Sequence, residues 1–264
     1  MHYEWVSFTT DYGTSDGFVA ACKGVIAGIA PSVRILDVTH DVSPQDIRRG
    51  ATVLAQTVPY LPPAVHLAVV DPGVGTARRA VVVVTPTSLL VGPDNGLLLP
   101  AADTLGGVLT AYELAEPKYR LPVVSLTFHG RDIFAPAVAH LATGVSPAEF
   151  GPEVADLVRL PEPRTVVTAR RLTSDIIGVD RFGNLQLAAT EAELAALGLR
   201  TGDRVRVRHY RSTVDATVGG TFGDVPLGTL VVHVDSAGQV ALAVNGGSAV
   251  EALGGGSGDV TLSR

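Results

Sequence analysis

The sequence predicts an α/β protein with two parts, a mainly parallel sheet with flanking helices and a smaller domain of short strands. Three observations lead to this prediction. Strand-like and helix-like segments alternate over roughly the first 145 residues, a Pro-rich stretch follows, and short β segments separated by Gly and Asp fill the remainder. We therefore expect an N-terminal α/β domain over residues 1–160 and a C-terminal barrel or sandwich over residues 166–264.

The strands expected in the first domain are short β-branched runs or continuously apolar runs. Runs such as "AVVVVTP" lack the polar alternation of a half-exposed strand, and they are typical of strands buried on both faces of a parallel sheet. We expect strands at residues 6–11, 34–40, 64–71, 80–86 and 88–93.

The helices are predicted from apolar periodicity and from residues that favour helix ends. Asp16 lies near the start of the first helix, and Ser43 is the expected N-cap of the second, with Pro44 at its first helical position. Gly144 is expected to end the third. Helices are expected at residues 16–30, 43–61, 131–144 and 190–198.

Composition and charge exclude several classes of function. The formal net charge is −6 and the basic residues are scattered, so we expect no nucleic-acid surface. The single cysteine, Cys22, excludes an intrachain disulfide, and no Cys/His cluster has zinc-binding spacing. Residues 1–12 do not have a signal-peptide pattern, and the apolar runs are too short to span a membrane. We therefore expect a cytoplasmic protein without membrane or nucleic-acid partners.

Three polar loops follow expected strands or precede an expected helix. In open α/β sheets, ligands bind beyond the carboxyl ends of the strands, so these loops can converge on one crevice. The loops are "TTDYGTSDG", "VVDPGVGTARR" and "TFHGRDIF", and their candidate functional residues are Asp11, Asp16, Asp71, Arg78 and His129. The pattern predicts a small-molecule site that contains carboxylates and an Arg-His pair.

Each of these residues also has a purely structural interpretation. On this interpretation Asp16 caps a helix, Asp71 fixes a turn, and His129 is a hydrogen-bonded, partly buried histidine. Of the two adjacent arginines, Arg79 is expected to point to solvent, whereas Arg78 is better placed to reach back across its loop. The residues alone leave these alternatives open and do not identify a substrate.

Six stretches taken together are similar to one family. They resemble the S-adenosyl-L-methionine (SAM) hydroxide adenosyltransferases, also called SAM hydrolases, which are related to fluorinating and chlorinating enzymes. The similarity runs in register from about residue 6 to 262. The stretches are "TDYGTSDG", "ILDVTHDVSPQDIRRGA", "VVDPGVGTARR", "GPDNGLL", "TFHGRDIFAPAVAHLA" and "DRFGNLQL".

The resemblance implies a fold, an assembly and a reaction. The expected architecture is an N-terminal α/β domain with a C-terminal β-barrel, assembled as a homotrimer with sites between neighbouring subunits. The implied reaction converts SAM and water to adenosine and L-methionine, with SAM as substrate and no cofactor. The family's catalytic set falls on Asp71, Arg78 and His129.

The resemblance also implies which residues contact the substrate. Asp11 would hold the ribose hydroxyls and Asp16 the methionine ammonium group, while the other contacts would come from the neighbouring subunit. Asp180 would meet the ammonium, Phe182 would stack on adenine and Asn184 would bond its edge. The methionine carboxylate and the adenine would be contacted by Ser236 and by the backbone near Gly246.

Some residues depart from the patterns of the family or of its halogenating relatives. Halogenating relatives lack an aspartate at the position of Asp71 and carry a serine at that of Gly130, so both residues disfavour halogenation. Asp235 replaces an asparagine that the family usually shows, and Val244 stands where a halogenating relative has arginine.

Three alternatives are weighed against SAM hydrolysis. The first loop is also similar to that of nucleoside hydrolases, which cut the N-glycosidic bond, but Ser15 replaces the second carboxylate that a calcium site there would need. A second alternative is a non-catalytic SAM- or adenosine-binding protein. The third concerns "DRFGN" alone, which is also typical of a β-turn with a core Phe.

Overall fold

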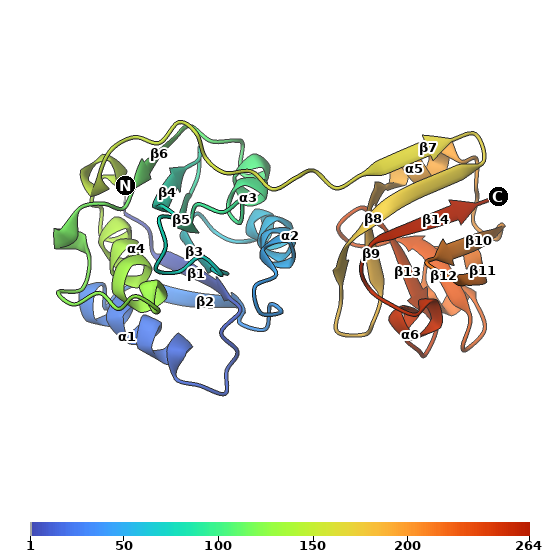
Figure 1. Ribbon diagram of the computed structural model, residues 1–264, viewed down its shortest axis with the longest axis horizontal. Helices are drawn as coiled ribbons and strands as arrows, with labels where there is room; N and C mark the ends of the chain where they lie inside the picture. Colours follow the sequence, from blue (N-terminus) through green and yellow to red (C-terminus); the bar gives the residue numbers. More distant parts are fainter. Residues whose placement is uncertain (1) are drawn as a thin grey trace. The chain divides into compact units, whose positions relative to one another are not determined.

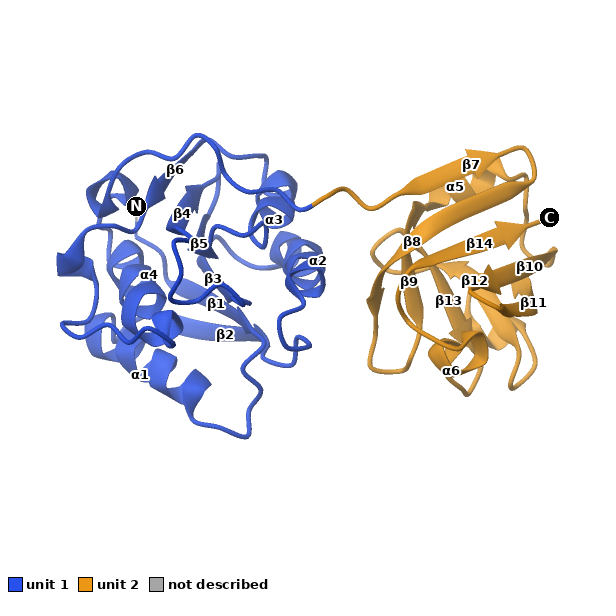
Figure 2. Ribbon diagram, in the orientation of Figure 1, with its two compact units in different colours: residues 1–160 blue, residues 161–264 orange. Residues whose placement is uncertain are grey.

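The computed structural model describes residues 2–264, which divide into two compact units (Figures 1 and 2). The first unit ends at Leu160 and the second begins at Pro161. Each unit has its own hydrophobic core. The predicted fold class is confirmed, because the first unit holds a mostly parallel sheet with helices and the second a closed β-barrel. Among the described residues, no helix has the length and apolar character needed to cross a bilayer.

The sheet of the first unit has six strands in the order β2-β1-β3-β5-β4-β6. Strands β2, β1, β3 and β5 are parallel, whereas β4 pairs antiparallel with both β5 and β6. Their bounds are β1 Trp5–Thr10, β2 Arg34–Thr39, β3 Val65–Val69, β4 Ala80–Val84, β5 Leu89–Pro93 and β6 Thr110–Glu113. The connection between β4 and β5 is too short for a parallel crossover, so these two apolar strands form a hairpin.

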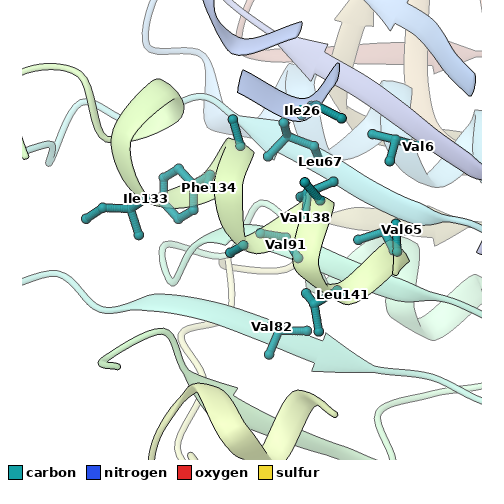
Figure 3. Close-up of a cluster of buried hydrophobic side chains, with 14 of the residues drawn as sticks. Val6, Ile26, Val65, Leu67, Val82, Val91, Ile133, Phe134, Val138 and Leu141 are labelled. Atoms are coloured by element: carbon teal, nitrogen blue, oxygen red, sulfur yellow. The ribbon is translucent and has the colours of Figure 1, made fainter. Parts of the chain in front are cut away.

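Helices cover both faces of this sheet. Helices α1 and α4 pack on one face, where Ile26, Val138 and Leu141 meet the strand residues Leu67 and Val82 (Figure 3). Helices α2 and α3 pack on the other face. Their bounds are α1 Phe18–Ile29, α2 Ile47–Thr57, α3 Leu99–Thr104 and α4 Ala135–Ala142. The sheet is therefore buried on both sides, as its continuously apolar strands predict.

The parallel strands β1 and β3 lie side by side, and the direction in which successive strands are added to the sheet reverses between them. After β1 the chain continues to β2 on one side, and it then crosses to β3 on the other. Thr10, at the end of β1, pairs with Val69, at the end of β3. This is a topological switch point, where ligands of open α/β sheets bind. Asp11 and Asp71 follow these two strand ends.

Helix α2 begins later than the sequence suggests. Asp46 is its N-cap, and the Asp46 side chain accepts a 2.9 Å hydrogen bond from the Arg49 amide. The predicted N-cap, Ser43, and the predicted first helical residue, Pro44, are therefore both wrong. The physical reason is Gln45, whose φ of 67° lies outside the helical region and turns the chain just before the helix.

The second unit is a closed β-barrel of seven strands in the order β14-β10-β11-β12-β13-β9-β8. Pairing of β14 with β8 closes the barrel, and β7 adds to the free side of β8. The strands are β7 Thr165–Thr168, β8 Arg171–Val179, β9 Leu185–Thr190, β10 Arg204–His209, β11 Ser212–Val218, β12 Leu230–Val234, β13 Gln239–Val244 and β14 Asp259–Ser263. Two short helices, α5 Glu191–Ala196 and α6 Ala249–Leu253, complete the unit. The barrel expected from the resemblance is thus confirmed over the sandwich.

Candidate active site

Asp71, Arg78 and His129 meet in one hydrogen-bonded network in the first unit. Asp71 follows β3, Arg78 comes from the same loop, and His129 comes from the loop before α4. The Nε of Arg78 donates to Oδ1 and Oδ2 of Asp71 at 2.9 and 3.0 Å, and its Nη2 also donates to Oδ2. The same Nη2 lies 2.9 Å from Nδ1 of His129. The side chains of Asp71 and Arg78 are only 5% and 10% exposed, so this ion pair is largely shielded from water.

The contact between Arg78 and His129 fixes the protonation state of the imidazole. A guanidinium carries donors and no acceptor, so Nδ1 of His129 must be unprotonated to accept its hydrogen bond. The ring is then neutral, with its proton on Nε2. Burial, and next the charge of Arg78, lower the pKa of His129 below its ordinary value of 6.5. Geometry and electrostatics therefore agree that His129 is a neutral donor at Nε2.

A buried aspartate holds the segment that carries His129. Asp132 is fully buried, and its carboxylate accepts hydrogen bonds from the Ser125 amide at 2.8 Å and from Arg131 Nε at 2.6 Å. The Asp132 carbonyl also accepts from the Leu121 amide at 2.9 Å. These bonds tie the loop to a π-helical turn, Gly130–Phe134, that follows His129 directly. Turns of this kind recur at functional sites.

Tyr12 packs against the residue next to His129. A Cβ atom on Gly130 would lie 2.1 Å from the Tyr12 hydroxyl, so the ring takes the room that a side chain at position 130 would need. Tyr12 also makes edge-to-face contacts with Phe18 and Phe128, at ring-centroid distances of 6.1 and 5.9 Å. Burial raises the pKa of Tyr12, which keeps its phenol neutral. Tyr12 therefore forms an aromatic wall beside the segment that carries His129.

The two acidic residues of the first loop have different surroundings. Asp11 follows β1, and its Oδ2 accepts a 2.9 Å hydrogen bond from the Gln45 amide. Asp16 is exposed, and helix α1 begins two residues later with Gly17 as N-cap and no side-chain cap bond. The interpretation of Asp16 as a helix cap is therefore wrong, and its carboxylate faces solvent.

The expectation that Arg79 points to solvent is wrong, because its guanidinium is held by two carboxylates. Its Nε and Nη2 donate to Oδ2 of Asp94 at 2.9 and 2.6 Å, and its Nη1 donates to Asp156 at 2.6 Å. Asp94 is almost fully buried and also accepts from the Val158 amide at 2.8 Å. Arg79 thus links the neighbouring strand end at Asp94 to the distant segment at Asp156, which is a structural role.

In the second unit, Asp180 organises the turn between β8 and β9. Its Oδ1 accepts from the amides of Phe182 and Asn184 at 2.8 and 2.9 Å, and its Oδ2 accepts from the Asn184 side chain at 2.7 Å. Gly183 has a φ of 79°, which completes the turn. The "DRFGN" stretch is therefore a β-turn, but Phe182 is 76% exposed, so the core position considered for it is wrong within this unit.

The remaining candidates in the second unit lie at opposite ends of strand β13. Ser236 is exposed in the hairpin before β13, where the Asp235 carboxylate accepts from two backbone amides. Gly246 follows β13 and has a φ of 72°. Its loop adjoins the Asp180 turn, because the Val250 amide donates to the Gly183 carbonyl at 3.1 Å.

Comparison with family models identifies the chain. The SAM hydroxide adenosyltransferase N-terminal domain matches residues 6–151, and the C-terminal domain of the same family matches residues 174–261. The chain belongs to the SAM hydroxide adenosyltransferase family.

Curated relatives and solved structures agree with this membership. The chain is 58% identical over 251 residues to the (R)-S-adenosyl-L-methionine hydrolase of Salinispora arenicola (strain CNS-205), covering 94% of this chain and 93% of that protein. It is 30% identical to the fluorinase of Actinoplanes sp. (strain N902-109), covering 91% and 90%. An uncharacterized conserved protein from Thermotoga maritima superposes with a TM-score of 0.92 at 37% identity, covering 98% and 100%.

Tyr12 and Gln45 were not predicted to act in the site. Both lie within stretches that carry the family resemblance, but neither has the charge or nucleophilicity that marks a candidate residue. Each affects the site through geometry, Tyr12 by filling the space at Gly130 and Gln45 through its backbone amide. The proximity of Gln45 to Asp11 in space has no signal in the sequence.

The contact between Tyr12 and Gly130 can be tested with a double-mutant cycle. We expect Gly130→Ala to lower the free energy of unfolding by about 1–3 kcal/mol, because the new methyl group clashes with the Tyr12 hydroxyl. Tyr12→Phe should relieve much of this loss, since the nearest atom is then Cζ at 3.1 Å. Urea unfolding followed by the fluorescence of Trp5, the single tryptophan, measures both effects in the first unit. Additive effects of the two changes would contradict the contact.

Proposed function

We propose that this chain hydrolyses S-adenosyl-L-methionine to adenosine and L-methionine. Relatives that carry the name (R)-S-adenosyl-L-methionine hydrolase are 57–58% identical to it over more than nine tenths of its length. The observation that carries the proposal is the buried network of Asp71, Arg78 and His129 at the end of the central strand β3. Such a network can orient a water molecule and accept its proton.

The reaction is an in-line displacement at the ribose 5′ carbon. A bond forms between the water oxygen and C5′, the bond between C5′ and the sulfonium sulfur breaks, and its electron pair leaves on neutral methionine. One proton of the water is released. Adenosine, methionine and a proton therefore balance SAM and water, so we propose that SAM is the substrate and that no further cofactor takes part.

The network supports different roles for Asp71 and His129 in the proton transfer. Ionising bulk water at pH 7 would cost about 12 kcal/mol, so the proton should move as the attack proceeds rather than beforehand. Nδ1 of His129 is occupied by Arg78 and Nε2 carries a proton, so the imidazole has no free acceptor. The proton then goes to the Asp71 carboxylate. His129 donates from Nε2 to the attacking oxygen and stabilises its developing charge.

Exclusion of water contributes to the same step. An attacking oxygen with developing negative charge and a sulfonium are opposite charges that disappear as the bond forms, so bulk water stabilises the reactants more than the transition state. The low exposure of Asp71 and Arg78, together with the aromatic wall at Tyr12, supports a poorly hydrated position for the reacting oxygen. Fixed groups then replace bulk solvent there.

The other candidate residues are proposed as substrate contacts. Asp11 holds the ribose hydroxyls, which fits its place beside Asp71 at the switch point, and the exposed Asp16 meets the methionine ammonium group. In the second unit the proposed contacts are Asp180 for the ammonium, Phe182 and Asn184 for adenine, Ser236 for the carboxylate and the backbone near Gly246 for adenine. The exposed Phe182 ring supports a stacking role.

We further propose a cytoplasmic homotrimer in which the first unit of one subunit meets the second unit of a neighbour. Large apolar side chains are exposed in both units, among them Leu126 at 76%, Phe182 at 76% and Leu227 at 81%. Exposed apolar groups of this size support burial in an interface. The net charge of −6 supports the absence of a nucleic-acid partner.

Product analysis tests the proposed reaction. Incubation with SAM should give adenosine and methionine by chromatography, and ¹⁸O from labelled water should appear in the adenosine 5′ hydroxyl. Free adenine would instead indicate a nucleoside hydrolase, and unchanged SAM a binding protein.

Asp71→Asn should lower kcat by about 10²-fold or more because the proton acceptor is lost. His129→Asn keeps an acceptor for Arg78 and should lower kcat less. A larger loss in His129→Asn than in Asp71→Asn would contradict the assignment of roles.

The pH dependence of kcat/KM should show the neutral state of His129. Because its pKa is lowered in the folded protein, His129 stays neutral down to a pH below 6.5 and becomes protonated as the pH falls further. Activity should therefore decline as the pH falls, with a midpoint below pH 6.5. His129→Asn should remove the contribution of the imidazole to this decline. An acid limb centred at or above pH 6.5 would contradict the assignment.

Mixing two variants that have defects in different units tests the shared site. Asp71→Asn inactivates the first-unit part of every site, and Phe182→Ala weakens the second-unit part. If neighbours share a site, a mixed trimer contains some sites with both parts intact. Co-expressed subunits should then recover a measurable fraction of activity, about one quarter for random mixing of equal amounts. No recovery in mixed trimers identified by mass would overturn the shared site, and a monomer in light scattering would overturn the assembly.

A further inference from the structure

Gln45 has a backbone conformation that its residue type rarely adopts. Its φ is 67°, and Tyr210, with a φ of 47°, is the one other non-glycine residue at positive φ among residues 2–264. Left-handed backbone is unfavourable for residues with a Cβ atom, and it persists where the surrounding structure enforces it. Tyr210 has a local explanation, because it lies in the tight hairpin between β10 and β11. Gln45 precedes a helix and lies in no hairpin.

The left-handed turn directs one amide to a carboxylate of the site. The Gln45 N–H donates to Oδ2 of Asp11 at 2.9 Å, across 34 positions in the sequence. The next two amides bond within their own turn, since Asp46 donates to the Ser43 carbonyl at 3.0 Å and Ile47 donates to the Gln45 carbonyl at 2.9 Å. In this conformation the Gln45 amide is not part of the hydrogen bonding of the helix that follows, and it donates to Asp11 instead.

The two loops that carry these residues are also joined by further hydrogen bonds, two between backbone groups and one between side chains. The Gly13 amide donates to the His40 carbonyl at 2.8 Å, and Nδ1 of His40 lies 2.9 Å from the Thr10 hydroxyl. The Val42 amide donates to the Thr10 carbonyl at 3.4 Å. Because these bonds lie on both sides of Asp11 and shortly before Gln45, they hold the two loops at a fixed separation. The amide of residue 45 is therefore held in place by its loop, and it sets the orientation of the Asp11 carboxylate.

We propose that the left-handed backbone of Gln45 is a positioning element for Asp11, which holds one carboxylate oxygen so that the other meets a ribose hydroxyl. The proposal rests on the function proposed above for Asp11. Within residues 2–160, Oδ1 of Asp11 accepts no hydrogen bond, so it remains open to a ligand. The role belongs to the backbone of residue 45, and the Gln side chain is incidental to it.

A graded series at position 45 separates backbone from side chain. Gln45→Gly, Gln45→Ala and Gln45→Val all keep the N–H, but they differ in how readily they adopt positive φ, which Gly does freely and the β-branched Val least. Isothermal titration would measure the Kd of each variant for adenosine and for 2′,3′-dideoxyadenosine, which lacks both ribose hydroxyls. Unfolding followed by Trp5 fluorescence shows whether each variant is folded.

We expect adenosine binding to weaken in the order Gly, Ala, Val, with about a tenfold difference in Kd between Gly and Val. Binding of 2′,3′-dideoxyadenosine should change less than about twofold, because without the diol Asp11 has no partner. Asp11→Ala should reproduce this selective loss. The matched control is Tyr210→Val, which strains a left-handed residue in the second unit and should leave the ratio of the two Kd values unchanged.

Two results would overturn the inference. Equal loss in Gln45→Gly and Gln45→Val would show that the side chain makes the contact, and equal weakening of both ligands would show a general structural effect. If Val at position 45 prevents folding, the comparison of Gly with Ala carries the test. Failure of the proposed reaction is recognised separately. A chain that does not hydrolyse SAM can still show adenosine binding that weakens in the order Gly, Ala, Val while 2′,3′-dideoxyadenosine binding stays nearly constant. Conversely, an active enzyme without that order would overturn the positioning role alone.

Discussion

The guanidinium of Arg78 is the group on which the arrangement of the candidate active site depends. It donates to both oxygens of Asp71 and to Nδ1 of His129, so it sets the orientation of a carboxylate and the tautomer of an imidazole at once. Burying this ion pair has a desolvation cost that can match its Coulombic gain. We therefore attribute its presence to geometry rather than to stability. A lysine could neutralise Asp71 but could not span both partners with a planar fork of donors.

The scaffold explains why these groups meet at this place. Strands β1 and β3 lie side by side and end together, because the chain leaves β1 toward one side of the sheet and returns to β3 on the other. Asp11 and Asp71 thus emerge next to each other without any sequence proximity. His129 reaches the same edge because helix α4 packs across the sheet and the buried Asp132 holds the loop before it.

The sequence predicts the strands and their polar ends better than it predicts partners. The buried run that ends at Asp71 is recognisable from apolar continuity alone. Apolar continuity does not give the direction in which β4 and β5 pair, because strands buried on both faces look the same in either direction, and only the short connection between them indicates the hairpin. Arg79 and Arg78 are adjacent and chemically identical. Asp94 and Asp156, which are 15 and 77 positions from Arg79, decide that it is structural. The left-handed Gln45 likewise depends on a contact 34 positions away.

The charges of the site suit a reaction in which the substrate loses its charge. Asp71 and Arg78 cancel, and His129 is neutral, so the nucleophile side contributes no net charge. Asp11 and Asp16 leave the surrounding loop negative, which favours a cationic sulfonium over a neutral nucleoside. In the proposed reaction, attack removes the positive charge from sulfur. The attraction between these carboxylates and the sulfonium is thereby absent from adenosine, which keeps only the proposed contact of its ribose with Asp11.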